Sequence, residues 1–273
     1  MNVLTIADKT AELPYRELVE HYGSPLLVLD CNVLRSKYRA LQEALPGVEL
    51  FYAIKSLPER AALAALAAEG ANFDIATSGE IELLRSIGAD PAATIHTHPI
   101  KRDRDIRDAL DFGCTTFVVD NIDELAKFEA YRSVARILLR VSFRGKDVKS
   151  DLSRKFGCDL RDVPWMLTQA AALGIQVVGL SFHVGSQSAK SDAHVAAVRA
   201  CRDFYGNTTL AGTEHLHILD IGGGFPADYS GDGLDLASFC RPINEALAAY
   251  PEHIRIIAEP GRVLSAPSIR SIS

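Results

Sequence analysis

The sequence lacks several features that would by themselves define a protein class. Its five cysteines are spread over 273 residues without any Cys-x-x-Cys pair, which argues against a disulfide framework or a structural zinc site. No apolar run approaches the roughly 20 residues that a membrane span requires. Asp8 and Glu12 stand where a signal peptide would have basic and then apolar residues. Reduced thiols without a leader or an anchor predict a cytoplasmic protein.

An excess of positive charge is also missing. The 29 Lys and Arg residues face 35 Asp and Glu residues, and the net charge of −6 comes without a basic stripe. We therefore expect neither nucleic acid nor an anionic membrane surface as a partner. A hydrophobic content of 48% excludes disorder, and no low-complexity segment or Pro/Gly-rich linker divides the chain. A site for a small molecule is the remaining expectation.

Short apolar runs alternate with amphipathic segments along almost the whole chain. The runs are rich in Val, Ile, Leu and Phe without strict polar alternation, which is typical of parallel strands buried on both faces. Predicted strands lie at Leu50–Lys55, Asn72–Ala76, Thr94–Thr97, Thr116–Val119, Ala135–Val141, Val177–His183, Leu216–Ile221 and Arg255–Glu259. Helical signals lie between them, as in Pro58–Ala68, Ser78–Ser86, Asn121–Tyr131 and Val163–Leu173.

Two α/β architectures share this alternation, a closed (β/α)8 TIM barrel and an open doubly wound sheet. Eight strands in about 250 residues are typical of the barrel. Polar residues also favour it, because they gather at the C-terminal ends of the predicted strands, where a barrel carries its chemistry. They are Lys55, Asp74, His96, His98, Arg140, His183, the run Gly222–Gly224, and Glu259. Residues 1–28 precede the first βα unit and are expected to belong to another structural layer.

Lys55 follows the apolar residues Phe51–Ile54. Apolar neighbours lower the pKa of a lysine, and the resulting neutral amine attacks an aldehyde to form a Schiff base. The alternative is a lysine that merely extends its amine into solvent. The sequence leaves both open for an isolated lysine.

Glycines follow the last two predicted strands. The run Gly222–Gly224 offers backbone N–H groups that a phosphate approaches closely, because no Cβ atom intervenes. Gly261 and Arg262 add further donors after the eighth strand. A phosphate site at this position recurs in TIM barrels. A simple turn is the alternative for each element taken alone.

Glu259 and His183 are candidates for contacts with a ring. Glu259 ends an apolar strand with no neighbouring acid in the sequence, so it requires a cationic partner. A protonated heteroaromatic nitrogen is one candidate, and a salt bridge to Arg262 is the other. His183 is expected to stack on a ring or to relay a proton, the alternative being an ordinary hydrogen-bonded histidine.

Two His-x-His pairs, His96 with His98 and His215 with His217, suggest metal ligands in a barrel hydrolase. The first pair ends its strand and the second begins its strand, so the two pairs lie at opposite ends of a barrel. We therefore predict no metal site.

Five motifs together resemble a known family, the pyridoxal-phosphate-dependent ornithine/lysine/diaminopimelate decarboxylases with the alanine racemase fold. The motifs are Tyr52–Lys55, Asn72–Ala76, Ser181–Gln187, Asp220–Pro226 and Glu259–Arg262. They occur in the family's order, and the resemblance covers residues 20–270. The segments Ile95–Lys101 and Leu152–Gly157 are most similar to the bacterial ornithine/lysine enzymes.

The resemblance implies a role for each matching residue. Lys55 is implied to hold pyridoxal 5′-phosphate as a Schiff base, Glu259 to pair with the pyridine nitrogen, and His183 to stack on the ring. The implied contacts to the phosphate and ring come from Ser186, Gly223, Gly224, Pro260, Gly261 and Arg262. Asp74, Glu80 and Arg140 match supporting positions near the lysine and the ring hydroxyl. The implied reaction is decarboxylation of ornithine or lysine to a diamine, in polyamine metabolism.

The chain departs from the family in its length. Relatives continue into a β-barrel domain that supplies a catalytic cysteine and further substrate contacts across a homodimer interface, so this chain is expected to be truncated. The implied organisation is a segment of that β-domain in residues 1–28, the cofactor-binding barrel in 29–265, and the start of the return to the β-domain in 266–273. Leu57 stands where many relatives have Asn. A non-catalytic or regulatory homologue, a diaminopimelate decarboxylase and a racemase-like barrel stay open, although Glu259 disfavours the last.

Overall fold

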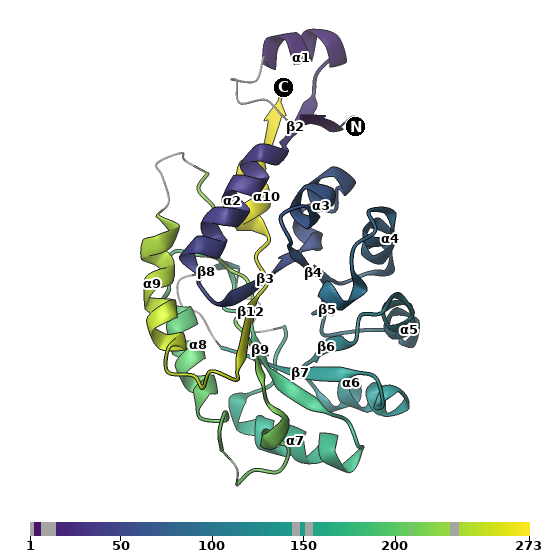
Figure 1. The fold of residues 1–273 in the computed structure, drawn as a ribbon, viewed down its shortest axis with the longest axis vertical. Helices are drawn as coiled ribbons and strands as arrows, with labels where there is room; N and C mark the ends of the chain where they lie inside the picture. The colour runs from purple at the N-terminus through teal and green to yellow at the C-terminus, as the bar shows by residue number, and fades with distance from the viewer. Residues whose placement is uncertain (1–2, 7–14, 144–147, 151–154, 208, 230–234) are drawn as a thin grey trace.

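The computed structural model describes residues 3–6, 15–143, 148–150, 155–207, 209–229 and 235–273. Eight parallel strands close into a barrel, in the order β11-β12-β3-β4-β5-β6-β7-β9 (Figure 1). They are β3 (Val48–Ala53), β4 (Asn72–Ile75), β5 (Thr94–His96), β6 (Thr116–Val119), β7 (Arg136–Val141), β9 (Val177–Phe182), β11 (Ile218–Asp220) and β12 (Arg255–Ala258). The predicted TIM barrel is confirmed. Asp8, Glu12 and residues 152–154 lie outside the described residues.

Helices lie on the outside of the barrel and follow the strands in turn. They are α2 (Cys31–Ala44), α3 (Arg60–Ala67), α4 (Ser78–Ser86), α5 (Asp103–Phe112), α6 (Ile122–Ala126), α7 (Val163–Ala172), α8 (Asp192–Arg202), α9 (Leu236–Leu247) and α10 (Arg262–Ser268). Side chains cap several of their N-termini, as Thr77 does for α4 and Asn121 for α6. The predicted helix at Asn121–Tyr131 divides into α6 and a 3₁₀ segment, Lys127–Tyr131. None of the described helices is long and apolar enough to cross a membrane.

Two predicted strands have boundaries that are wrong by two residues, and five others extend one residue further than the strand in the structure. Lys55 does not end strand β3 but lies in a 3₁₀ turn, Ile54–Ser56, because Ala53 is the last residue of β3 that pairs with β4. Strand β11 begins at Ile218 rather than at Leu216, which follows another 3₁₀ turn, Thr213–His215. Because Lys55 lies in this turn, the direction of its side chain does not follow the inward and outward alternation of residues in strand β3.

Two separate apolar clusters hold the barrel together. The larger one lies between the strands and the surrounding helices. The smaller one takes one side chain from each of seven barrel strands and lies within the barrel, as the alternation of inward and outward residues requires. Its members are Phe51, Ile95, Val118, Leu138, Val178, Ile218 and Ile257. They form an apolar floor below the polar residues at the strand ends.

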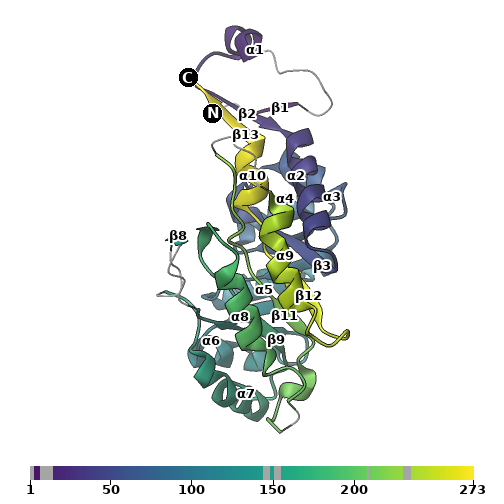
Figure 2. The same ribbon diagram turned by 90° about the vertical axis from the view of Figure 1, so that its left-hand side faces the viewer.

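A three-stranded sheet lies apart from the barrel, next to α2 and α10 (Figure 2). Its central strand β2 (Leu26–Asp30) pairs in parallel with β1 (Val3–Ile6) and antiparallel with β13 (Ile269–Ile272). Helix α1 (Tyr15–Tyr22) lies at the same end of the molecule. Strand β2 spans the predicted boundary between residues 28 and 29, and the three domain ranges stay a prediction. Two short strands, β8 (Val148–Ser150) and β10 (Ser186–Ser188), form an antiparallel pair.

Candidate active site

Lys55 lies at the mouth of the barrel beside two acids. Its Nζ atom is 3.1 Å from Oδ2 of Asp74 and 4.0 Å from Oε2 of Glu259. The lysine side chain keeps 52% of its surface accessible, whereas the two carboxyl groups are buried. Burial lowers the pKa of Lys55, but the Asp74 and Glu259 charges more than offset this, and the pKa is raised overall. The expectation of a lysine with a lowered pKa is therefore wrong.

Thr97 connects the two acids that flank Lys55. Its hydroxyl lies 2.6 Å from Oδ1 of Asp74 and 3.3 Å from Oε2 of Glu259. The Thr97 backbone N–H also donates to Oδ1 of Asp74. Burial raises the pKa of Asp74 to about 6, against the lowering effect of the Lys55 charge, so Asp74 is ionised near neutral pH. Asp74 and Lys55 form an ion pair in which the carboxylate is buried and the lysine side chain is accessible.

Glu259 has an acidic neighbour that the sequence analysis missed. The carboxyl groups of Glu259 and Asp220 are hydrogen-bonded to each other, and Asp220 also accepts from the Ser181 hydroxyl at 3.0 Å and from the Gly222 N–H at 2.8 Å. Burial and the charge of Asp220 raise the pKa of Glu259 well above its usual range. A carboxyl-carboxylate pair requires a shared proton. The alternative salt bridge to Arg262 is not formed, because the Arg262 guanidinium donates to the Tyr229 hydroxyl.

His183 follows strand β9 and has one ring nitrogen already engaged. Nδ1 accepts a hydrogen bond from the Gly185 N–H at 3.0 Å, so the neutral ring carries its proton on Nε2. Burial and the charges of Arg140 and Lys55 lower the pKa of His183 well below its usual range. Arg140 is buried in β7 and lies over the Phe156 ring at 5.4 Å. His183 is a neutral ring that lies near the lysine and Arg140.

The run Gly222–Gly224 requires glycine for a reason other than the one inferred from the sequence. Gly222 and Gly224 have φ angles of +66° and +99°, and added Cβ atoms would lie 2.1 Å from the Phe182 oxygen and 2.3 Å from the Gly185 oxygen. A Cβ atom on Gly223 would lie 2.7 Å from the Glu259 oxygen. The protein's own backbone therefore excludes any side chain here. The run brings the ends of β9, β11 and β12 into contact.

The other predicted residues surround this centre. Glu80 accepts from the Ala76 N–H and supports the end of β4. The Pro260 carbonyl accepts from the Ala53 N–H and ties the loop after β12 to the lysine strand. Gly261 lies against Ser56, so close that a Cβ atom would be 2.9 Å from the Ser56 Cβ. Ser186 begins strand β10.

These groups match what pyridoxal phosphate needs. Among the described residues, none accepts a hydrogen bond from the N–H groups of Gly223 or Gly224, and such free N–H groups suit a phosphate. Glu259 offers a buried carboxyl to a protonated ring nitrogen, and Lys55 offers an accessible amine to an aldehyde. The residues therefore fit this cofactor.

The two His-x-His pairs do not form a metal site. His96 is buried against the Phe117 ring, and Nδ1 of His98 lies against the Ile100 backbone. His217 contacts the His215 carbonyl before strand β11 begins. Within the described ranges, no three His, Cys, Asp or Glu side chains are grouped as metal ligands.

Replacing His96 with leucine is expected to make stability less sensitive to acid. Burial and the Lys101 charge lower the pKa of His96 to about 3, from 6.5 in an unfolded chain. Below pH 6.5 the unfolded state therefore binds a proton that the folded state does not. The free energy of unfolding of the wild type should fall relative to that of His96→Leu by about 1.4 kcal/mol per pH unit.

Urea unfolding of both proteins between about pH 7 and pH 5 measures this difference. Phe117→Leu is the matched control, because it alters the ring that packs on His96 without removing a titrating group. Its difference from the wild type should not change with pH. A pH-independent difference for His96→Leu would contradict the assignment of a buried neutral imidazole.

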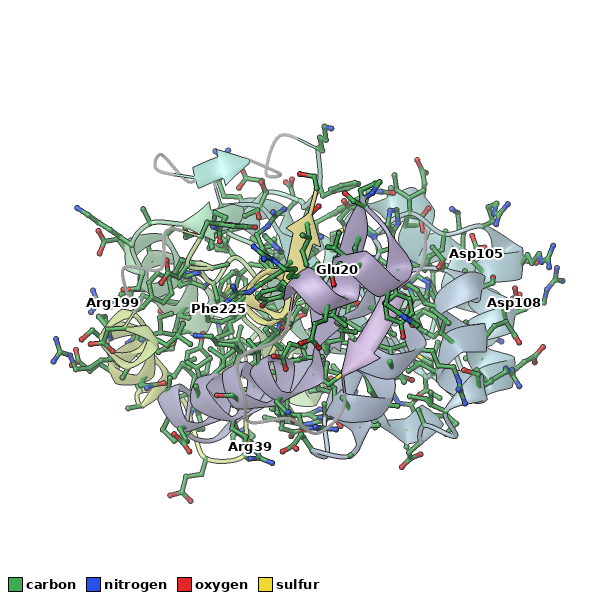
Figure 3. All side chains as sticks on the ribbon, turned by 90° about the horizontal axis from the view of Figure 1, so that it is seen from above. Glu20, Arg39, Asp105, Asp108, Arg199 and Phe225 are labelled. Carbon is green, nitrogen blue, oxygen red and sulfur yellow. The ribbon has the colours of Figure 1, made fainter. Side chains whose placement is uncertain are left out.

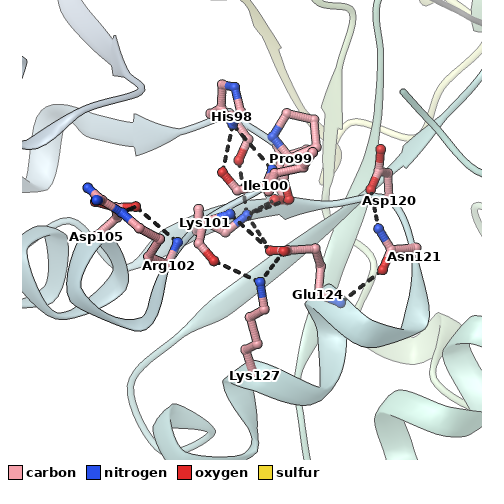
Figure 4. Close-up of polar contacts among 11 residues, drawn as sticks. His98, Pro99, Ile100, Lys101, Arg102, Asp105, Asp120, Asn121, Glu124 and Lys127 are labelled. Carbon is pink, nitrogen blue, oxygen red and sulfur yellow. Dashed lines mark hydrogen bonds and ion pairs between the residues drawn. The ribbon is translucent and has the colours of Figure 1, made fainter. Parts of the chain in front are cut away.

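A fully buried lysine supports the loop that carries Thr97 (Figure 4). The Lys101 Nζ atom donates to the carbonyls of His98 and Pro99, each at 3.0 Å, and of Val118 at 2.6 Å. Glu124 lies 3.7 Å from this amine and is also paired with Lys127. Lys101 thereby connects the loop after β5 to strand β6 and helix α6.

Sequence reasoning missed Thr97, Asp220 and Lys101 as parts of the site. Thr97 and Asp220 both carried a usable signal, since each stands at the C-terminal end of a predicted strand. The neighbouring histidines were considered as metal ligands, and the glycines after Asp220 as a phosphate site, but neither Thr97 nor Asp220 was assigned a role. Lys101 ends the segment Ile95–Lys101 of the family resemblance, but its burial depends on strand β6 and helix α6, which the sequence does not place beside it.

Comparisons with known proteins show which family this chain resembles. Residues 32–266 match the family model described as pyridoxal-dependent decarboxylase, pyridoxal binding domain. Lysine/ornithine decarboxylase from Selenomonas ruminantium is 30% identical over 266 residues, which are 97% of this chain and 67% of that protein. Mouse ornithine decarboxylase is 35% identical over 238 residues, 86% of this chain and 51% of that protein.

A solved structure extends the likeness to three dimensions. Lysine/ornithine decarboxylase from Vibrio vulnificus, complexed with putrescine, has a TM-score of 0.87 and 46% identity, over 94% of this chain and 68% of that chain. This chain therefore spans about two thirds of the bacterial relatives and about half of the mouse enzyme. The predicted family resemblance and its cofactor are confirmed, and the chain belongs to the pyridoxal-dependent decarboxylase family.

Proposed function

We propose that this chain is the cofactor-binding barrel of an enzyme that decarboxylates ornithine or lysine to a diamine, in polyamine metabolism. The observation that carries the proposal is the cluster of Lys55, Asp74, Thr97 and Glu259, with an accessible amine between two buried acids. The names of the relatives support the substrate class. The Vibrio vulnificus protein has been solved with putrescine and with cadaverine, the diamines that correspond to ornithine and lysine.

The side chains at the mouth of the barrel have separate roles in the proposed reaction. When bound, pyridoxal phosphate supplies a ring that takes up the electron pair left as the substrate carboxylate departs as CO₂. Oδ2 of Asp74 accepts a hydrogen bond from Nζ of Lys55 and so holds the lysine where its amine would meet the aldehyde of the cofactor. Glu259 would hold the ring nitrogen, and the proton that it shares with Asp220 leaves one negative charge on the two carboxyl groups, which suits a protonated ring nitrogen. His183 packs on the ring as a neutral surface.

The apolar floor of the barrel lies beneath this site. Phe51 and Ile257 belong to the cluster within the barrel, on strands that precede Lys55 and Glu259. An apolar surrounding favours the loss of a carboxylate charge as neutral CO₂. We expect the residues that bind the distal amine of the substrate to lie in the parts of the longer relatives that this chain does not match. We expect contacts with a homodimer partner to lie there too.

Two measurements on the purified chain test the proposal. Addition of pyridoxal phosphate should produce the visible absorbance of the cofactor bound covalently to a lysine. CO₂ release from ornithine and lysine should exceed release from diaminopimelate. Absence of the absorbance change would contradict the proposed site, and preference for diaminopimelate would overturn the substrate class.

A second candidate function is non-catalytic binding of the cofactor or regulation of a related enzyme. The observation that favours it is a relative from Xenopus laevis named antizyme inhibitor 2, which is 36% identical over 85% of this chain. Covalent cofactor binding without CO₂ release, in the longest form of the protein, would support this candidate over the first.

A further inference from the structure

His194 is a fully buried histidine that the chemistry proposed above does not use. It lies on helix α8, and its ring stacks on Phe225 at 5.3 Å and meets Phe239 edge to face at 5.9 Å. Figure 3 shows Phe225 among the packed side chains, whereas Arg199 of helix α8 lies at the margin. The inward face of α8 therefore carries an imidazole in an aromatic pocket.

One nitrogen of this ring is engaged and the other is not. Nε2 lies 3.0 Å from the Gly223 carbonyl oxygen, and because a carbonyl only accepts, Nε2 carries the proton. Nδ1 is buried without a partner among the described residues. Burial lowers the pKa of His194 to about 4, so the ring is neutral near pH 7. A phenylalanine would fill this pocket without an unpaired nitrogen, so the hydrogen bond to Gly223 is what histidine adds.

This hydrogen bond fixes the orientation of one peptide group. The Gly223–Gly224 peptide is trans and planar, so its carbonyl and its N–H point in opposite directions. With the carbonyl held toward α8, the Gly224 N–H points away from that helix. The next carbonyl, that of Gly224, is held by the Ser188 N–H at 3.0 Å. Two glycines have no side chains of their own to maintain this orientation.

We propose that His194 is a positioning residue that holds the Gly223–Gly224 peptide with the Gly224 N–H directed at the phosphate group of the cofactor. The inference rests on the pyridoxal phosphate site proposed above. The proposal adds that recognition of the phosphate depends on a side chain of helix α8, and not only on residues at the ends of the barrel strands. The free Gly224 N–H then acts as an oriented donor to an anion.

Three variants separate this role from a packing role, with pyridoxal 5′-phosphate and pyridoxal as paired ligands. His194→Phe keeps the aromatic packing but removes the donor, and His194→Gln retains an N–H at a similar reach. Phe239→Leu is the matched control, because it disturbs the same pocket without touching the hydrogen bond. Dissociation constants for both ligands are measured by absorbance titration of the cofactor-free chain.

His194→Phe should bind pyridoxal phosphate about tenfold more weakly and pyridoxal with nearly unchanged affinity, since one charge-assisted hydrogen bond is weakened. His194→Gln should restore most of the loss, and Phe239→Leu should affect both ligands alike. Equal loss of both ligands in His194→Phe, or no recovery in His194→Gln, would overturn the role of His194 alone. A wild-type chain that binds neither ligand would overturn the proposed cofactor site as well.

Discussion

Lys55→Arg is expected to abolish covalent binding of pyridoxal phosphate. Arginine keeps the positive charge that Asp74 and Glu259 face, but its guanidinium does not lose a proton to become a nucleophile. CO₂ release by any form of the enzyme that contains this barrel should fall by on the order of 10⁴-fold. Well-placed intramolecular groups have effective molarities of about 10⁵ M or more, which an amine from solution does not match.

Borohydride reduction followed by peptide mapping measures this loss, because it fixes the cofactor on the residue that holds it. Lys190→Ala, at an exposed lysine, is the matched control and should be labelled on Lys55 like the wild type. Cofactor fixed on another lysine in the wild type, or an undiminished amount of fixed cofactor in Lys55→Arg, would show that Lys55 is not the residue that binds the cofactor covalently. Retention of non-covalent affinity in Lys55→Arg would in turn support the roles assigned to the glycine run and Glu259.

Much of the fold follows from the sequence, because two physical patterns are strong in it. Strands buried on both faces produce continuous apolar runs, and Thr116–Val119 was predicted with the boundaries that β6 has. Helix α4 also begins and ends as predicted, since Thr77 supplies a cap just before Ser78. The strand β13 was not predicted, because its partner β2 lies more than 200 residues away in the chain.

Only some residues of the candidate site were predictable, and its electrostatics were not. The C-terminal ends of parallel strands meet at one end of a barrel, so Lys55, Asp74 and Glu259 were expected together. Their pKa values depend on distances across the mouth, which the sequence does not contain. The pairing of Asp220 with Glu259 joins neighbouring strands β11 and β12, and only the register of those strands brings the two carboxyl groups together.

Lys101→Met is expected to lower the free energy of unfolding by about 3 kcal/mol, an effect typical of breaking a buried network of charged hydrogen bonds. Methionine has a similar length and fills the space, but it leaves the His98, Pro99 and Val118 carbonyls without their shared donor. Burial lowers the pKa of Lys101 to about 8, so the amine is mostly charged near pH 7. Urea unfolding near that pH measures the change.

Lys127→Met is the matched control, because Lys127 binds the same Glu124 carboxylate from a side chain that is 38% exposed. Its loss should cost about 1 kcal/mol or less, as for partly exposed ion pairs in general. The loop after β5 should loosen more in Lys101→Met than in Lys127→Met, because Lys101 binds the carbonyls of His98 and Pro99, whereas Lys127 binds that of Lys101. Thr97 begins that loop and bridges Asp74 and Glu259, so faster amide hydrogen exchange at Thr97, His98 and Ile100 should accompany weaker cofactor binding. Equal destabilisation by the two variants would mean that Glu124, and not the three carbonyls, accounts for the burial of Lys101.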